Sequence, residues 1–351
     1  MKTIYLHIGH YKTGSTAIQA YCHEHADALR EVGYLYPSSA RPNNSPTTHG
    51  HLALTLGRDH GFIPPAWYGA KIPTDEPYAQ ILREIEAAPE QNIIISSEEF
   101  VQLAMRRDPE AAVADLKARL SGYDVKIVFY FREPLSLLKS WYNQVNKGSR
   151  PTRNFPTFFM NVVQSFLGQR GIYHHFAQIF GRQNMILRPY GAVGTAHISG
   201  FLEAVGCSHR PSADLPLVNE AQDLAKLEII RLNKERPADL TYDRLTITEF
   251  EDPEPFLQRI ERVNRGYGEL MKIAGQPASS ALSAPAILDH YAALLLPASA
   301  EVPLNPKEAD RLRSLAAQSA AKGPLIAGAF NDVADVIDSA VTADEAKSQL
   351  P

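Results

Sequence analysis

Four short apolar runs, separated by long helix-like segments, constrain the fold of this chain more than any other feature. They cover residues 2–9, 92–97, 125–131 and 185–190. A continuous run of β-branched and aromatic residues, such as NIIISS or VKIVFYF, is typical of a strand that is buried on both faces. Strands that alternate with helices pair in parallel and carry helices on both faces of the sheet. The sequence therefore predicts an α/β fold with a central parallel sheet.

The segments between and after these runs predict the domain organisation. Helices are expected over residues 15–32, 78–88, 109–120 and 134–147, with more helix up to residue 180. Gly33 is expected to cap the first of these helices at its C-terminal end. The stretch GQPASSALSAP, residues 275–285, is a predicted linker. We therefore predict a main α/β domain over residues 1–275 and an Ala-rich, mainly helical C-terminal extension over residues 276–351.

The composition argues against several classes of protein. The chain has 351 residues and a net charge of −4, which gives no electrostatic reason to expect nucleic acid or an anionic membrane as a partner. Cys22 and Cys207 lie far apart and form no metal-ligand or redox spacing, which fits a reducing compartment. No window approaches the ~20 apolar residues of a membrane span, and no apolar leader precedes Thr3. We therefore expect a cytoplasmic protein without an integral membrane segment.

The stretch LHIGHYKTGSTAIQ, residues 6–19, has the pattern of a phosphate-binding loop with a displaced lysine. Such a loop reads G-x-x-x-x-G-K followed by Ser or Thr. Here Gly9 and Gly14 keep the glycine spacing, but Ser15 stands where the lysine would be. The only lysine of the loop is Lys12, two residues before the second glycine. Lys12 would therefore approach a bound anion from a different side than the lysine of a kinase does.

The residues that open the helix after this loop form the predicted anion site. Backbone N–H groups at a helix N-terminus attract anions, and the helix dipole adds to that attraction. The amides of Gly14, Ser15 and Thr16 are expected to point at a phosphate. A generic glycine turn with a solvated Lys12 explains the same residues, so the loop alone leaves both interpretations open.

A second stretch, YFREPLSLLKSWYNQ at residues 130–144, favours anion binding. Arg132 follows a predicted strand directly, and Ser140 lies eight residues further on, inside the next helix. Arginine forms two parallel hydrogen bonds with a phosphate, and a serine hydroxyl can add a third. Ligands of parallel α/β sheets bind at the carboxyl ends of the strands. The pair is therefore placed to hold a second phosphate of the same ligand, although each residue taken singly also fits a surface role.

Together the two stretches resemble the superfamily of sulfotransferases that use 3′-phosphoadenosine 5′-phosphosulfate. The run KTGST, residues 12–16, is similar to the 5′-phosphosulfate loop of that superfamily, in which a lysine precedes a short Gly/Ser/Thr run. Arg132 and Ser140 are similar to its 3′-phosphate motif. The resemblance implies a P-loop-like fold, this phosphosulfate as the cosubstrate, and no metal. It also implies that Lys12 contacts the oxygen that bridges phosphate and sulfate.

The resemblance extends over about residues 1–235 and is to a bacterial branch of the superfamily. It includes the stretches GYLYP, SSEEF, RPYGAV and VNEAQDLAKLEIIRLN. The Tyr-Glu-Asp run often found on the later strand stands here as Tyr190-Gly191-Ala192. The resemblance therefore assigns Tyr190 to the cofactor contacts, together with Thr13 and the rest of the KTGST loop. KGSR, residues 147–150, is a weak counterpart of the Arg-Lys-Gly loop of the cytosolic members.

Sulfuryl transfer also needs a base for the acceptor's proton, and two places supply candidates. Glu98 and Glu99 lie at the carboxyl end of the predicted strand 92–97, where superfamily members carry a catalytic histidine or glutamate. A glutamate against an apolar wall has a raised pKa, which suits a base. We expect only one of these neighbours to face the site and prefer Glu98. His49 and His51 are the other candidates, although for either one alone an exposed, solvated histidine is the better explanation.

Residues 37–78 are rich in Pro, Gly, Asn, His and Thr and are predicted to form a long irregular stretch on the acceptor side. Within it, Trp67 and Tyr68 would stack on a sugar ring or an aromatic acceptor, or else fill the core. The acceptor is therefore expected to be a small molecule or a glycan.

The sequence thus predicts a sulfotransferase that moves a sulfuryl group to an acceptor hydroxyl, of a carbohydrate or glycolipid, by in-line transfer without metal. A P-loop kinase or NTPase is one alternative. It would have a lysine at position 15, where this chain has Ser15, and an acidic magnesium ligand, which Glu98 could imitate. A non-catalytic nucleotide-binding protein is the other alternative, and it would lack a base that faces the cofactor.

Overall fold

The computed structural model divides into two compact units. The described residues are 1–66, 68, 71–148, 158, 164–211, 254–277, 306–319, 331, 334, 335, 338 and 342. The first unit comprises Met1–Glu133, Gln164–Glu220 and Gly266–Ala278. The second comprises Pro134–Val163, Ala221–Arg265 and Ser279–Pro351. The predicted boundary at residue 275 stays a prediction.

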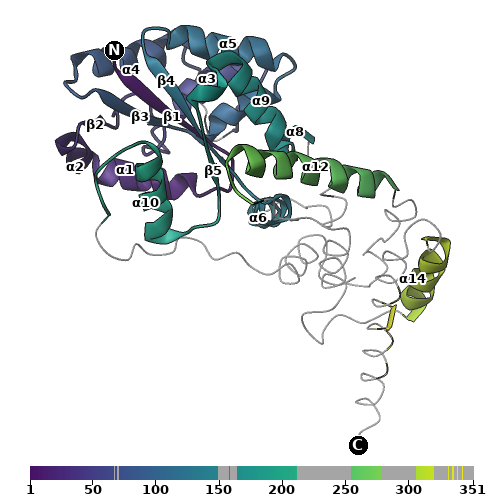
Figure 1. The fold of residues 1–351 in the computed structure, drawn as a ribbon. Coiled ribbons are helices and arrows are strands. Elements are labelled where there is room, and N and C mark those ends of the chain that lie inside the picture. The colour runs from purple at the N-terminus through teal and green to yellow at the C-terminus, as the bar shows by residue number, and fades with distance from the viewer. Residues whose placement is uncertain are drawn as a thin grey trace, which may run out of the picture. The chain divides into compact units, whose positions relative to one another are not determined.

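A parallel sheet forms the centre of the first unit (Figure 1). Within the described residues it has five strands in the order β2-β3-β1-β4-β5. The strands are β1 (Thr3–Gly9), β2 (Tyr34–Leu35), β3 (Asn92–Ser96), β4 (Asp124–Phe131) and β5 (Met185–Pro189). Each neighbouring pair runs in parallel, and Tyr5 of β1 lies between Ile94 of β3 and Lys126 of β4. The predicted α/β class with a central parallel sheet is therefore confirmed.

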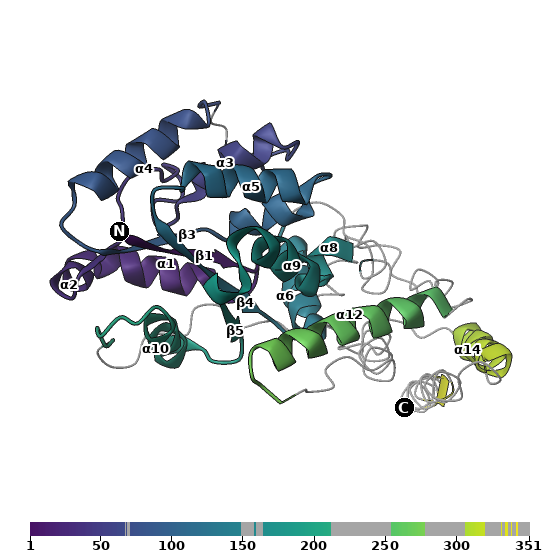
Figure 2. The same ribbon diagram turned by 45° about the horizontal axis from the view of Figure 1, so that its top comes forward.

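Helices cover both faces of this sheet (Figures 1 and 2). One face carries α1 (Ser15–Glu24), α2 (Ala26–Glu31) and α10 (Gly194–Ala204). The other carries α3 (Gly50–Asp59), α4 (Asp75–Ala87), the 3₁₀ helix η1 (Glu98–Met105), α5 (Pro109–Arg119) and α9 (Gln169–Phe180). On the first face, Ile18, Phe201 and Leu202 pack with Ile94 and Val128 in one buried cluster. Burial on both sides explains why the strands read as continuous apolar runs.

The sequence does not predict strand β2. It is only two residues long, and its pairing consists of Tyr34 with Asn92 and Leu35 with Ile93. Two residues are too short to show the periodicity by which a strand is recognised.

The single helix predicted over residues 15–32 is wrong, because the chain forms α1 and α2 with a break at His25. The His25 ring stacks on Tyr21 at 4.1 Å, and its Nδ1 lies 3.2 Å from the Tyr21 carbonyl oxygen. A side chain that bonds to a nearby helical carbonyl competes with the helix. Gly33 follows α2 with φ of +85°, the left-handed conformation expected of a C-terminal cap.

The irregular stretch predicted over residues 37–78 is also wrong in part, because it contains all of α3 and the start of α4. Leu52, Leu54 and Leu56 of α3 are all buried. Residues at this spacing lie on several sides of a helix, so α3 lacks the narrow apolar stripe that marks a surface helix.

The remaining described helices are α6 (Pro134–Asn146), α8 (Gln164–Leu167), the 3₁₀ helix η2 (Arg182–Asn184), α12 (Glu254–Ile273) and α14 (Pro306–Ser319). Of these, α14 lies within the predicted C-terminal extension, residues 276–351, most of which lies outside the described residues. Most of the predicted linker, residues 275–285, lies outside the described residues. Among the helices that are described, none has the length and apolar character needed to cross a membrane.

The direction of the chain connections reverses at the carboxyl ends of β1 and β4. The chain leaves β1 toward β2 at one edge of the sheet, and it leaves β4 toward β5 at the other. Ligands of open α/β sheets bind where neighbouring strands send the chain in opposite directions. The loop after β1 and Arg132 after β4 both lie at this point.

Candidate anion-binding and catalytic site

The loop between β1 and α1, residues 9–14, is folded tightly against the end of β4. The His10 amide donates to the Tyr130 carbonyl at 2.9 Å, and the Thr13 hydroxyl donates to the His10 carbonyl at 2.6 Å. Lys12 has φ of +61°, a left-handed conformation that side-chain-bearing residues rarely adopt. These two hydrogen bonds fix the conformation of the loop. The Thr13 hydroxyl donates its proton to a carbonyl group of the loop itself.

Neighbouring side chains approach the two glycines of the loop so closely that a larger residue does not fit at either position. Gly9 has φ of +71°, and a Cβ added there would lie 2.9 Å from the Cβ of Glu98. Gly14 has φ of +80°, and a Cβ added there would lie 2.4 Å from Nε2 of His197. Both the backbone angle and the space therefore exclude a side chain. The spacing of Gly9 and Gly14 in the sequence therefore has a direct structural cause.

Helix α1 presents its N-terminus without a side-chain cap. Gly14 is the N-cap residue, and the first turn contains no acidic residue. The first N–H groups of a helix have no partner within it, so they favour an anion. Ser15 is only 5 % exposed, and its Oγ has no hydrogen-bond partner in the described part of the chain. Thr16 is exposed on the helix surface. A buried hydroxyl without a partner at a helix N-terminus fits a bound anion that accepts its hydrogen bond.

Arg132 connects the loop to the ends of β4 and β5. Its Nη1 donates to the Lys12 carbonyl oxygen at 2.6 Å, and its guanidinium lies over the Tyr190 ring, 4.9 Å from the centroid. Gln169 of α9 accepts from the Arg132 amide at 2.7 Å and donates to the Arg132 carbonyl at 2.6 Å. Burial lowers the pKa of the Arg132 guanidinium, so an anion nearby would stabilise its charge.

Tyr190 directly follows β5, and its amide donates to the Phe131 carbonyl at 2.8 Å. The structure thus brings together Lys12, Gly14, Arg132 and Tyr190 from three loops that are far apart in sequence. Ser140 lies on α6, in the second unit, so its pairing with Arg132 stays a prediction.

Glu98 and Glu99 begin η1, on the β3 side of the same loop. Gln19 of α1 donates from Nε2 to Oε2 of Glu98 at 2.7 Å. The Tyr11 hydroxyl, which belongs to the loop, donates to Oε2 of Glu99. The expectation was that only one of the two side chains would face the site. In the structure both carboxylates contact the β1–α1 segment.

Glu99 has the electrostatic character of a base. Its pKa is raised to about 7, mainly by burial; the Tyr11 hydrogen bond acts in the opposite direction, and the neighbouring Glu98 charge adds a smaller rise. Gln102 donates from Nε2 to the Tyr11 hydroxyl oxygen at 3.0 Å. That bond leaves the phenolic proton free to be donated to Glu99. A carboxyl group that titrates near neutral pH is suited to accept a proton during a reaction.

His49 is placed as a structural residue. It is fully buried, its Nδ1 accepts from the Ser96 amide at 3.1 Å, and its Nε2 lies 3.0 Å from the Pro37 carbonyl. These contacts fix the neutral tautomer with the proton on Nε2. Burial also lowers the pKa of His49 to about 3. The ring joins the 37–78 segment to the end of β3.

His51 lies on α3 and packs its ring edge-to-face against Tyr68 at 5.5 Å. Burial lowers its pKa. None of the contacts described for His51 joins it to the loop of residues 9–14. Trp67, the other predicted acceptor contact, lies outside the described residues.

Sequence reasoning missed three residues of this site: Tyr11, His197 and Gln169. His197 of α10 is buried against Gly14, and burial lowers its pKa to about 4. An aromatic residue inside a glycine loop was the one signal available, since Tyr11 stands between Gly9 and Gly14. The other two come from helices far along the chain and carry no local pattern.

Within the described residues, no group of His, Cys, Asp and Glu side chains is arranged to hold a metal ion. Compared with protein-family models and with curated proteins, the sequence gives no match.

Proposed function

We propose that this protein is a sulfotransferase that uses 3′-phosphoadenosine 5′-phosphosulfate. The observation that supports it best is the arrangement of charge around one helix N-terminus. Arg132 bonds to the Lys12 carbonyl on the β4 side of the loop, and Glu99 bonds to Tyr11 on the β3 side. Cationic groups suit an anionic leaving group, and a carboxylate suits the acceptor's proton.

In this proposal the loop holds the 5′-phosphosulfate. The amides of Gly14, Ser15 and Thr16 bind the 5′-phosphate, and the Ser15 hydroxyl adds the hydrogen bond that it lacks among the described residues. Thr13 shapes the loop from within. Lys12 neutralises the charge that develops on the oxygen between phosphorus and sulfur. By analogy with phosphoryl transfer, such positioning and neutralisation supply most of the catalysis.

Arg132 and Ser140 bind the 3′-phosphate in the same proposal. The Tyr190 ring supports the plane of the Arg132 guanidinium, whose planar donors suit a phosphate. The phosphate would also offset the desolvation that lowers the pKa of Arg132.

The reaction is a single in-line displacement. The acceptor's hydroxyl oxygen attacks sulfur as the bond from sulfur to the bridging oxygen breaks, and adenosine 3′,5′-bisphosphate leaves with the electron pair. The hydroxyl proton passes to a carboxylate. We assign this role to Glu99 rather than Glu98, because burial raises the pKa of Glu99 to about 7. The acceptor hydroxyl belongs to a carbohydrate or glycolipid, an assignment that rests on the bacterial resemblance alone.

Ligand-induced thermal stabilisation tests the class of function. A ligand at 100 times its dissociation constant adds ~2.7 kcal/mol to the free energy of unfolding. We expect adenosine 3′,5′-bisphosphate to raise the melting temperature without magnesium, and ATP to have little effect with or without it. Stabilisation by ATP that depends on magnesium would instead support the kinase alternative.

Product analysis separates an enzyme from a binding protein. The protein would be incubated with the ³⁵S-labelled donor and extracts of bacterial cells, and labelled products would be identified. Stabilisation by the bisphosphate without any labelled product would favour the non-catalytic alternative.

A further inference from the structure

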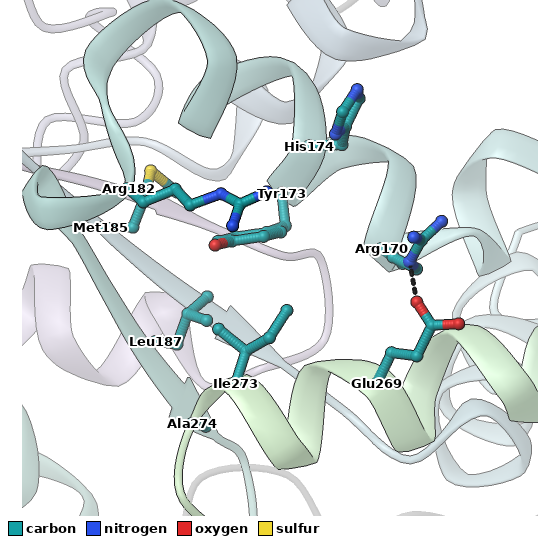
Figure 3. A pocket seen from close by; sticks show the side chains of 9 residues that line it. All are labelled: Arg170, Tyr173, His174, Arg182, Met185, Leu187, Glu269, Ile273 and Ala274. Carbon is teal, nitrogen blue, oxygen red and sulfur yellow. Dashed lines mark ion pairs between the residues drawn. The ribbon is translucent and has the colours of Figure 1, made fainter.

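A cavity lies beside the edge strand β5, and it shares no residue with the loop site (Figure 3). Its volume is about 460 Å³, which is within the usual size of a small-molecule site. Elements of the first unit form its walls: α9, η2, β5 and the last turns of α12. The lining residues are Arg170, Tyr173, His174, Arg182, Met185, Leu187, Glu269, Ile273 and Ala274.

The two arginines of this cavity differ in their partners. Arg170 forms an ion pair with Glu269, so its charge is balanced within the wall. Arg182 is exposed and makes no ion pair or side-chain hydrogen bond in the part of the chain that the structure describes. The cavity therefore carries one uncompensated guanidinium, whose planar donors suit a carboxylate or another oxyanion.

Met185, Leu187, Ile273 and Ala274 form the apolar part of the wall, and the rest of its surface is polar. Met185 and Leu187 are two residues apart on β5 and so point to the same side of the strand. Ile273, at the end of α12, is 50 % exposed. Figure 3 shows Leu187 and Ile273 on one side of the cavity and the Tyr173 ring, with the Arg182 side chain beside it, on the other. The space between them suits a flat or aliphatic group.

We propose that this cavity binds a small ligand that has one anionic group on an apolar body. Arg182 bonds to the anionic group, and the body lies between Tyr173 and the pair Leu187 and Ile273. The paired Arg170 and Glu269 close one end of the cavity without adding net charge. This inference does not depend on the proposed sulfuryl transfer.

Calorimetric titration with naphthalene-2-carboxylate tests both parts of the proposal. The neutral analogue naphthalene-2-carboxamide removes the charge, and inorganic sulfate removes the apolar body. We expect the carboxylate to bind roughly tenfold more tightly than the carboxamide, the effect of one hydrogen-bonded charge. Sulfate alone should bind more weakly than the carboxylate, because it leaves the apolar walls in water.

Two variants locate the binding. Arg182→Gln should weaken the carboxylate roughly tenfold and leave the carboxamide unchanged. Arg83→Gln, an exposed arginine on α4, is the matched control and should change neither ligand. Melting curves would show that each variant is folded. Equal affinities for carboxylate and carboxamide, an Arg182→Gln variant that binds like the wild type, or no binding of the carboxylate at all would each overturn the proposal.

Discussion

The two flanks of the β1–α1 loop differ in charge and in how firmly they are held. On the β4 flank, Gln169 bonds to both backbone groups of Arg132, and the guanidinium bonds to the Lys12 carbonyl. On the β3 flank, the side chain of Glu99 is held by the Tyr11 hydroxyl. The cationic flank is thus held at its backbone, whereas on the acidic flank the side chains of Glu98 and Glu99 are held by Gln19 and Tyr11. Substitutions on the first should therefore change ligand binding, and substitutions on the second should change rate and pH dependence.

The largest effect is expected on the acidic flank. Glu99→Gln keeps the size of the side chain but removes its ability to take a proton. We expect the rate of sulfuryl transfer to fall by about 10³, within the usual contribution of a general base. Single-turnover transfer at saturating donor is the measurement, with calorimetric binding of adenosine 3′,5′-bisphosphate to show that the donor site is intact.

Glu98→Gln is the matched control for that variant. Its carboxylate accepts a hydrogen bond from Gln19 of α1, so the amide should disturb the helix position but leave the proton acceptor in place. We expect a rate loss much smaller than that of Glu99→Gln. A larger loss for Glu98→Gln would transfer the role of base to Glu98.

Lys12→Ala should lower the transfer rate by ~10², comparable to the loss of one charge-stabilising donor. The effect should fall on the transition state, because the charge of the bridging oxygen grows as the bond breaks. Affinity for the bisphosphate should change less, since the amides of Gly14 to Thr16 remain. Lys12→Arg should restore little activity, because its donors are fixed in a plane. Lys71→Ala, an exposed lysine outside the site, serves as the control. Near wild-type transfer by Lys12→Ala would make Lys12 a solvated loop residue and the proposed mechanism wrong.

On the cationic flank, Arg132→Ala should weaken the bisphosphate by ~30-fold or more, the lower range for loss of one partner of a desolvated charge pair. Adenosine 5′-phosphosulfate lacks the 3′-phosphate. Its affinity should therefore fall only by the amount that the hydrogen bond from Arg132 to the Lys12 carbonyl contributes. The difference between the two losses measures the 3′-phosphate contact. Equal losses, measured by calorimetry, would mean that Arg132 supports the loop and does not bind that phosphate.

The sequence was sufficient to predict the parts of the fold that depend on local pattern. The runs that became β1, β3 and β4 are apolar because these strands are covered on both faces, whereas the residues of the edge strand β5 are only partly buried. The loop was recognisable because Gly9 and Gly14 have positive φ and no room for a side chain. Burial of a strand and a positive φ each restrict the residue type at particular positions, so both can be recognised in the sequence.

The contacts across the loop could not be predicted in the same way. Tyr11 and Glu99 are 88 residues apart, and Lys12 and Arg132 are 120 apart. They meet because β1 lies between β3 and β4, an arrangement set by the crossovers and not by any local pattern. For the same reason the sequence could not decide between Glu98 and Glu99, whose difference lies in their hydrogen-bond partners.

The smallest predicted effect concerns the hydrogen bond between Tyr11 and Glu99. Tyr11→Phe removes the hydroxyl that donates to Glu99 while keeping the ring, which stacks on Phe166. The bond stabilises the ionised carboxylate and so acts to lower the pKa of Glu99, which burial has raised to about 7. Its loss should raise that pKa further. A base must be deprotonated to act, so the rising limb of the pH–rate profile should move to higher pH.

The measurement is kcat/KM as a function of pH for wild type and Tyr11→Phe. At pH values above the limb, where Glu99 is ionised in both proteins, we expect a loss of less than about tenfold, because the variant keeps the base and loses one hydrogen bond. A structural defect alone would lower the whole profile without moving it. Tyr123→Phe, in the turn before β4, controls for loss of a phenol elsewhere. If the limb stays in place, the group that titrates is not bonded to Tyr11, and Glu99 is not the base. If it moves to lower pH, Tyr11 stabilises the protonated carboxyl group, and the two flanks differ less than their hydrogen bonds indicate.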